Sequence, residues 1–430
     1  MNTTRENDTN TYRVADQEAI GTDVALSPTM DAHDLVEADD LHDQIMTVNM
    51  GPQHPSTHGV LRVVLDLDGE KVVAARPDIG YLHTGIEKTI ESKRYEAALT
   101  CTDRIDYLSP MSNNLGYCMA VETILDCQVP ERAMWMRMLL VELQRLSSHM
   151  VWLGTHALDL GAMTAFLYCF RDREVILDLF EMISGARMMS SYIRIGGLES
   201  EVPDAFYPAV DKFLDIVPQR IDEYEGLLTK NALWIERLKN VGVITAEDAI
   251  SYGLTGPSLR GSGIKWDVRK DQPYLMYDQV SFEVPVGARG DCYDRYLVRM
   301  AEMRQSYSIC RQVMANVPRS GPFRVNDRKI VPPPKEELST SMEAVIHHFK
   351  LMTEGLHPPV GEAYQAIESP RGEFGVYVVS DGSNAPYRCH VRGPSFYNLS
   401  ALDHLCRGHL VADVVAIIGS IDIVLGEVDR

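Results

Sequence analysis

The pattern of apolar and polar positions near the start of the chain predicts an antiparallel sheet over residues 45–80. Every second position from 61 to 67 is apolar, with Arg62 and Asp66 on the other face, and Asp68-Gly69 is a hairpin signal. The loop 51–59 precedes this hairpin and contains two prolines and two glycines, which restrict its backbone path. The loop also carries His54 and His58, so two titratable side chains are expected on a stiff segment.

Apolar residues then recur at spacings of three and four for nearly 160 positions, which predicts helices. The clearest helix begins at Pro130, and Glu142, Arg145 and His149 form a polar stripe beside its apolar one. Further helices are predicted over residues 173–192, 208–240, 294–316 and 400–418. Residues 253–290 are dense in glycine and proline and predict a long irregular segment.

Alternation returns over residues 374–379 and 387–391, on either side of a second Asp-Gly turn. The apolar run from Leu410 to Gly426 predicts a buried helix and a strand, because the two aspartates within it exclude a bilayer span. The predicted class is α+β, mainly α: a large helical bundle with an N-terminal antiparallel β region and a mixed C-terminal region. We divide the chain into an acidic tail (1–44), a β region (45–80) and a helical body with a C-terminal β hairpin (81–430).

The acidic net charge of the chain argues against two classes of binding partner. The 430 residues include 41 Lys and Arg against 61 Asp and Glu, a net charge of −20, which argues against nucleic acid or anionic lipid as a charge-recognised partner. Residues 1–43 hold eleven of the acids against Arg5 and Arg13. We expect this tail to be solvated and disordered, and it has the character of neither a signal nor a transit peptide.

The cysteines and glycines give no cofactor signature. The eight cysteines include no C-x-x-C pair, so reduced thiols are expected rather than disulfides or a cluster site. The chain lacks G-x-G-x-x-G and G-x-x-x-x-G-K-[ST], so the sequence gives nucleotide binding no support.

Four residues could carry chemistry, and each has an ordinary alternative. His54 and His58 are four apart, but Pro55 interrupts the helix that a metal-binding pair needs. The alternatives are turn-stabilising histidines or a proton donor on a rigid loop. Asp159, at the end of the long helix, is a capping or surface group or a site carboxylate. Tyr107 is a buried structural tyrosine or a donor.

Five ordered blocks of sequence resemble the 49 kDa, or D, subunit of respiratory complex I, NADH-quinone oxidoreductase. They span residues 49–62, 79–88, 291–300, 372–382 and the terminal Gly-Glu-Val-Asp-Arg430, and the resemblance covers about residues 45–430. That family is related to the large subunit of nickel–iron hydrogenases and has lost the metal centre, so the resemblance implies a hydrogenase large-subunit-like fold. Hydrogenases of that type hold their metals with two C-x-x-C pairs, which are absent here.

The resemblance implies a quinone headgroup between the loop of His58 and Tyr107, with Asp159 pairing with the histidine. An adjacent carboxylate raises a histidine pKa, so we expect His58 to wait as a cation. The chain itself is expected to bind no metal or cofactor. The terminal 4Fe–4S cluster belongs to the neighbouring B subunit, and FMN and the other clusters to further partners. Expected partners are the B and C subunits and the membrane A and H subunits, with one copy per complex on the cytoplasmic side of the bacterial inner membrane.

Two positions depart from the family pattern, because Met189 stands where many members have His and Thr84 where some have Arg. These departures favour a lower-potential quinone such as menaquinone. Two other functions are kept open: a hydrogenase-like catalytic subunit, which the missing thiolates oppose, and a scaffold that only bridges clusters to membrane subunits. Whether the electron donor is NADH or ferredoxin is left open.

Overall fold

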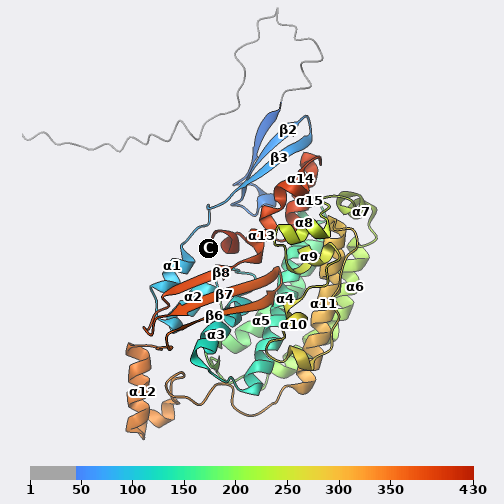
Figure 1. Ribbon diagram of the computed structural model, residues 1–430. Coiled ribbons are helices and arrows are strands. Elements are labelled where there is room, and N and C mark those ends of the chain that lie inside the picture. Colours follow the sequence, from blue (N-terminus) through green and yellow to red (C-terminus); the bar gives the residue numbers. More distant parts are fainter. Residues whose placement is uncertain (1–44) are drawn as a thin grey trace, which may run out of the picture. The chain divides into compact units, whose positions relative to one another are not determined.

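The computed structural model of the chain describes residues 45–430 (Figure 1). The acidic tail predicted for residues 1–44 lies outside the described residues. The fold is α+β and mainly α, as predicted. Small antiparallel sheets stand near the two ends of the described chain, with the helices between them.

The strands form three antiparallel sheets. The first has the order β1-β2-β3, the second pairs β4 with β5, and the third has the order β6-β7-β8. The strand bounds are β1 (Met46–Met50), β2 (Arg62–Asp68), β3 (Lys71–Asp78), β4 (Ile193–Arg194), β5 (Gly197–Leu198), β6 (Gly361–Ser369), β7 (Gly372–Ser380) and β8 (Arg388–Arg392). The predicted hairpin at Asp68-Gly69 is confirmed as the β2–β3 turn, and its apolar face is buried.

Helices make up most of the body. Their bounds are α1 (Ile86–Glu91), α2 (Tyr95–Thr102), α3 (Pro110–Leu125), α4 (Glu131–Asp159), α5 (Met163–Ser184), α6 (Phe206–Leu228), α7 (Ala232–Leu238), α8 (Ala246–Ser251), α9 (Gly256–Gly261), α10 (Val268–Asp271), α11 (Cys292–Asn316), α12 (Met342–Thr353), α13 (Pro394–Ser400), α14 (Leu402–Cys406), α15 (Val411–Ile421) and α16 (Leu425–Asp429). Three 3₁₀ turns, η1 (Pro55–Thr57), η2 (Tyr277–Gln279) and η3 (Lys335–Ser339), complete the described part.

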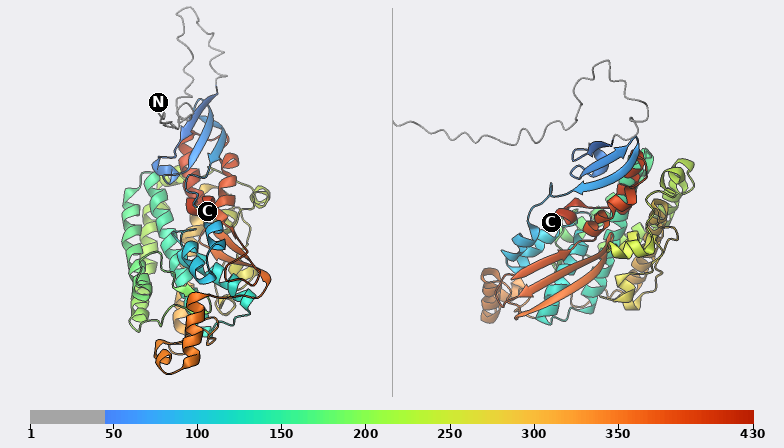
Figure 2. Two further views of the ribbon diagram at one scale, coloured as in Figure 1. Left: turned by 90° about the vertical axis from the view of Figure 1, so that its left-hand side faces the viewer. Right: turned by 45° about the horizontal axis from the view of Figure 1, so that its top comes forward.

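Helix α4 is the centre of the bundle. It packs against α5 and α11, while α6 packs against both α5 and α11, and α3 covers β6 and β7 of the third sheet. Figure 2 shows the green helices α5 and α6 on the side of the bundle away from the orange-red strands. The polar stripe of Glu142, Arg145 and His149 is fully buried, so its charges must be paired inside the protein.

Several predicted helices have different bounds. The predicted helices at 130 and 294–316 are confirmed as α4 and α11, whereas the helix predicted at 173–192 is α5, which starts earlier and ends before Gly185. The single helix predicted over 208–240 is two helices, because the Asn231 side chain accepts from the Leu233 and Trp234 amides and starts α7 anew. The segment predicted as irregular contains the short helices α9 and α10.

The C-terminal third differs most. The predicted strands at 374–379 and 387–391 are confirmed as β7 and β8, but β6 and α12 were not predicted. The helix predicted over 400–418 is divided among α13, α14 and α15. The strand predicted within Leu410–Gly426 is wrong, because the chain turns into α16, where the Val428 amide donates to the Val424 carbonyl. Among the described helices, none is both long and apolar enough to cross a bilayer.

Candidate functional site

The loop before β2 holds its two histidines by different means. The His54 Nδ1 atom accepts from the Ser56 amide at 3.2 Å and caps η1, which is the turn-stabilising role. Gly51 has a φ of +85°, and a Cβ there would lie 2.1 Å from the Leu61 carbonyl oxygen, so only glycine fits. His58 closes η1 in the left-handed conformation with φ 55°, which turns its side chain toward the body.

His58 is anchored to the C-terminal segment of the chain. Its Nδ1 atom lies 3.0 Å from the Ile423 carbonyl oxygen. Because a carbonyl only accepts, Nδ1 carries the proton and donates, and in the neutral ring Nε2 is then the unprotonated atom. The C-terminal segment therefore fixes both the orientation and the tautomer of His58.

The expectation that His58 waits as a cation is wrong. Burial lowers the pKa of His58 and outweighs the opposite influence of Asp422 and then Asp159, which both favour the charged ring. The Arg371 guanidinium lowers the pKa further. The resting ring is therefore neutral near pH 7, and Asp422 is the carboxylate that acts on it most strongly.

Asp159 lies on the same side of the molecule as the loop, at the last residue of α4. Its Oδ1 atom accepts a hydrogen bond from the Ser56 hydroxyl at 3.4 Å, whereas the His58 ring donates to Ile423. Burial raises the pKa of Asp159, and the neighbouring His58 opposes that rise. The structure thus brings Asp159 and His58 into electrostatic contact, with Ser56 as the hydrogen-bonded link.

Tyr107 reaches the C-terminal segment from another direction. Its ring lies against Gly426, where an added Cβ would be 3.3 Å from Tyr107 Cε1. Among the described residues we find no hydrogen-bond partner for the hydroxyl. Burial and the adjacent Asp106 raise the pKa of Tyr107, so the phenol stays protonated at neutral pH. His58 and Tyr107, far apart in sequence, therefore meet the chain at Ile423 and Gly426, three residues apart.

A buried chain of charges, not foreseen from the sequence, links these two contact points. Arg371 lies fully buried between β6 and β7, and its Nη1 atom donates to Asp106 at 2.7 Å. The other nitrogen, Nη2, lies 3.5 Å from the carboxylate of Asp422. Arg371 thus links Asp106, which precedes Tyr107, to Asp422, which precedes Ile423. It holds the two segments that carry the site in place.

A family model and whole-chain relatives match this sequence. The model of the respiratory-chain NADH dehydrogenase 49 kDa subunit matches residues 159–430. The D 2 subunit of NADH-quinone oxidoreductase from Roseiflexus sp. (strain RS-1) is 63% identical over 389 residues, which is 90% of this chain and 93% of the relative. The D 2 subunit from Chloroflexus aurantiacus is 61% identical (90% and 95% covered), and the D subunit from Geotalea uraniireducens is 55% identical (90% and 99% covered).

The chain belongs to the 49 kDa subunit family of respiratory-chain NADH dehydrogenase. It is therefore one subunit of a multi-subunit oxidoreductase. The blocks that carried the resemblance also meet in space, because the terminal Asp429 carboxylate accepts from the amides of Gly80 and Leu82 at 2.9 and 2.7 Å. The C-terminal segment of this 49 kDa-family chain thus contacts both His58 and Tyr107 of the candidate site. It also binds the segment 79–88 through hydrogen bonds.

A second buried cluster of the 49 kDa-family chain is an ion-pair network. Asp267, Glu302 and Glu368 lie close enough together to suggest a metal site. However, Arg260 donates to Glu302 at 2.6 Å and to Glu368 at 2.7 Å, and Arg269 donates to Asp267 at 2.7 Å. Guanidinium groups therefore neutralise these carboxylates. The polar stripe of α4 joins the same network.

The buried carboxyl group of Glu427 makes the stability of the fold depend on pH. It is fully buried, its Oε2 accepts from the Ser395 amide at 3.0 Å, and burial together with Asp106 raises its pKa to about 7. This is above the value of about 4.3 in an unfolded chain. The stability that protonated Glu427 contributes is therefore present below about pH 4 and is lost as the pH rises through about 7.

Because an amide does not ionise, we expect Glu427→Gln to remove this loss. The free energy of unfolding of the variant, relative to the native chain, should rise between about pH 5 and 8. Exposed Glu362→Gln is the control. Parallel pH profiles for native and Glu427→Gln chains would contradict the assignment.

Proposed function

We propose that this chain forms the quinone-reduction site of a proton-translocating NADH-quinone oxidoreductase. Electrons would pass from NADH through FMN and iron–sulfur clusters on partner subunits, the last being the 4Fe–4S cluster of the B subunit. The observation that carries the proposal is the convergence of His58 and Tyr107 on Ile423 and Gly426, with Asp159 bound to the His58 loop through Ser56.

The residues fit the chemistry of quinone reduction, which takes up two electrons and two protons. The Tyr107 phenol is a protonated donor for one carbonyl oxygen. On His58, Nδ1 is committed to Ile423, so Nε2 is the atom left to serve the second oxygen. Because the resting ring is neutral, Nε2 must gain a proton before it can donate one, and Asp422 and Asp159 favour that protonation.

The assembly and location form part of the same proposal. The names of the relatives support a place among other subunits of the complex. We propose contacts with the B and C subunits and with the membrane A and H subunits, as a peripheral chain on the cytoplasmic side of the bacterial inner membrane. Half-buried Met189 stands where many members have His and exposed Thr84 where some have Arg, and we propose menaquinone as the substrate on that ground.

A photoreactive quinone analogue tests the site in the intact complex. We expect labelling of peptides that contain His58 or Tyr107, and we expect a quinone-site inhibitor to suppress it. A chain that only bridges clusters to membrane subunits would take up no inhibitor-protected label. The hydrogenase alternative predicts bound nickel, which metal analysis of the purified complex would detect.

Asp159→Asn provides a prediction for the pH dependence. The two side chains are nearly isosteric, so assembly should be unchanged, while loss of the negative charge lowers the pKa of His58 further. A smaller fraction of His58 is then protonated at and above neutral pH, so quinone turnover should fall most on the alkaline side. The loss should stay below the roughly 100-fold typical of removing a general acid outright.

The measurement is the pH–rate profile of quinone reduction by the assembled complex. Asp215→Asn, on the exposed side of α6, is the matched control. An Asp159→Asn profile that superimposes on the native one would remove Asp159 from the proposal.

A further inference from the structure

Helix α12 carries apolar side chains on two opposite faces. Ala344 and Leu351 are buried against the body. At 3.6 residues per turn, the opposite face consists of residues whose side chains are largely exposed. These are Met342 (77% exposed), Val345 (43%), Ile346 (47%), Phe349 (64%) and Met352 (50%). One helix turn after another therefore presents apolar surface away from the protein, which marks an interaction surface.

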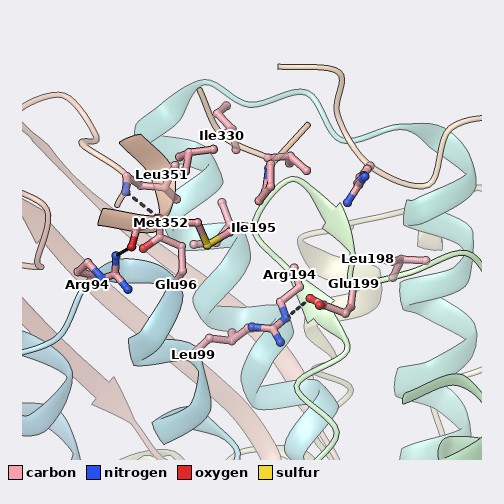
Figure 3. A pocket seen from close by; sticks show the side chains of 14 residues that line it. Arg94, Glu96, Leu99, Arg194, Ile195, Leu198, Glu199, Ile330, Leu351 and Met352 are labelled. Carbon is pink, nitrogen blue, oxygen red and sulfur yellow. Dashed lines mark hydrogen bonds and ion pairs between the residues drawn. The ribbon is translucent and has the colours of Figure 1, made fainter. Parts of the chain in front are cut away.

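A cavity begins where this face ends. It has a volume of about 280 Å³, and Met352 belongs both to the exposed face and to the cavity wall (Figure 3). The other apolar walls come from α2, from the β4–β5 region, from the segment around Ile330 and from the end of α12. The exposed face and the cavity are thus one continuous surface, which we call the α12 surface.

The charges around the cavity are unusual for this acidic chain. Three arginines, Arg94, Arg194 and Arg324, face two glutamates, Glu96 and Glu199. Arg194 pairs with Glu199 at 2.7 Å. Arg94 donates to the Met352 carbonyl at 2.7 Å, and within the described part of the chain neither it nor Arg324 forms an ion pair with a carboxylate. The cavity therefore offers positive charge to an acidic group from outside.

Glu96 has one carboxylate oxygen without a hydrogen-bond donor among the described residues. Its Oε1 atom accepts from the Leu356 amide at 2.7 Å, while Oε2 is buried and has no partner among the described residues. Buried carboxylate oxygens normally have donors. Glu96 also lines the cavity, so this unpaired acceptor lies in the cavity wall.

We propose that the α12 surface docks a neighbouring subunit of the same complex, which inserts an apolar side chain into the cavity and sets a carboxylate beside Arg324. This inference rests on membership of a subunit family and not on the quinone site. The cavity lies at the lower end of the roughly 300–1,000 Å³ range of small-molecule sites, and a small molecule would leave the exposed face of α12 uncovered. A second copy that docked through the same surface would set the same arginines against one another.

Site-specific photo-crosslinking of the intact complex identifies the occupant. With a benzophenone amino acid in place of Phe349, we expect an adduct to one other subunit, on a peptide in which apolar and acidic residues are neighbours. An adduct to a second copy of this chain, an adduct to lipid, or no adduct in the assembled complex would overturn the proposal.

Charge and packing variants provide the second measurement. Phe349→Asp and Arg324→Glu should each lower the amount of chain recovered in the complex by roughly tenfold or more, as for interface anchors. Leu233→Asp, at an apolar position of α7 that is 77% exposed, is the matched control and should assemble normally. Circular dichroism of each purified chain separates misfolding from failed docking.

A charge exchange distinguishes a specific contact from a general effect. Replacing the acidic residue of the crosslinked peptide by lysine should restore assembly of Arg324→Glu. Normal assembly of Phe349→Asp, or no restoration by the exchange, would also count against the α12 surface as proposed.

Discussion

Tyr107→Phe should lower quinone reduction by about 100-fold while leaving the fold intact. The ring packs against Gly426, and phenylalanine keeps that packing. The hydroxyl is removed, and within the described residues it holds no structural hydrogen bond. A preorganised donor to an oxygen that gains charge in the reaction typically contributes about 10²–10³ in rate. We expect the lower end of that range, because His58 can still supply a proton once it has taken one up.

The paired measurement compares NADH–ferricyanide with NADH–quinone activity on the assembled complex. The first activity uses electron entry at other subunits and should be normal, while the second falls and the apparent quinone affinity weakens. Tyr117→Phe is the control, because that buried hydroxyl donates to the Tyr95 carbonyl at 3.2 Å and has a structural role. A parallel loss of both activities in Tyr107→Phe would make Tyr107 a folding residue, and no loss would place the headgroup elsewhere.

Local patterns predicted the parts of the fold that depend on neighbours in sequence. The β2–β3 hairpin follows from alternation and its Asp-Gly turn, and α4 follows from an uninterrupted apolar stripe. The missed break between α6 and α7 depends on one side-chain cap at Asn231. Helix α12 was missed although its apolar residues recur at helical spacing, because the segment follows a proline-rich stretch and only Ala344 and Leu351 of its apolar residues are buried.

The candidate site was harder to predict from local patterns than the fold, because its residues are far apart in the sequence. His58, Tyr107 and Asp159 were candidates from the residues alone, but their grouping in one site came from the resemblance, because no spacing rule connects loops and helix ends that lie so far apart. Asp422 was visible in the sequence as a charge inside an apolar run, yet it served only to exclude a membrane span. It acts on His58 because the next residue, Ile423, binds the His58 ring through its carbonyl, a contact between residues far apart in the sequence.

The neutral state of His58 has a similar origin. A neighbouring carboxylate predicts a raised pKa, and both Asp422 and Asp159 do act in that direction. The desolvation that outweighs them depends on how the C-terminal segment closes over the loop, which only the three-dimensional structure reveals. The proton required by the proposed reaction must therefore arrive during turnover, since the resting ring does not hold it.

Arg371→Met should destabilise the chain by about 3–5 kcal/mol, the usual loss when one partner of a buried ion pair is removed. Methionine has a similar length, so packing is largely kept. The change leaves Asp106 and Asp422 without the guanidinium that lies 2.7 and 3.5 Å away, and Ser148 loses a bond of 2.9 Å. The free energy of unfolding from denaturant titration of the purified chain measures the effect.

The double variant Arg371→Met/Asp422→Asn tests the cause. If the loss arises from an unpaired buried carboxylate, removing the charge of Asp422 should recover part of the stability, and the two changes will not be additive. Arg371→Lys keeps a positive charge but cannot hold both carboxylates with a planar fork, so it should be more stable than Arg371→Met. It should still reduce quinone more slowly than the native complex, because Arg371 fixes the segments that carry Tyr107 and Ile423. Equal stability of the single and double variants would show that the loss does not arise from the charge of Asp422.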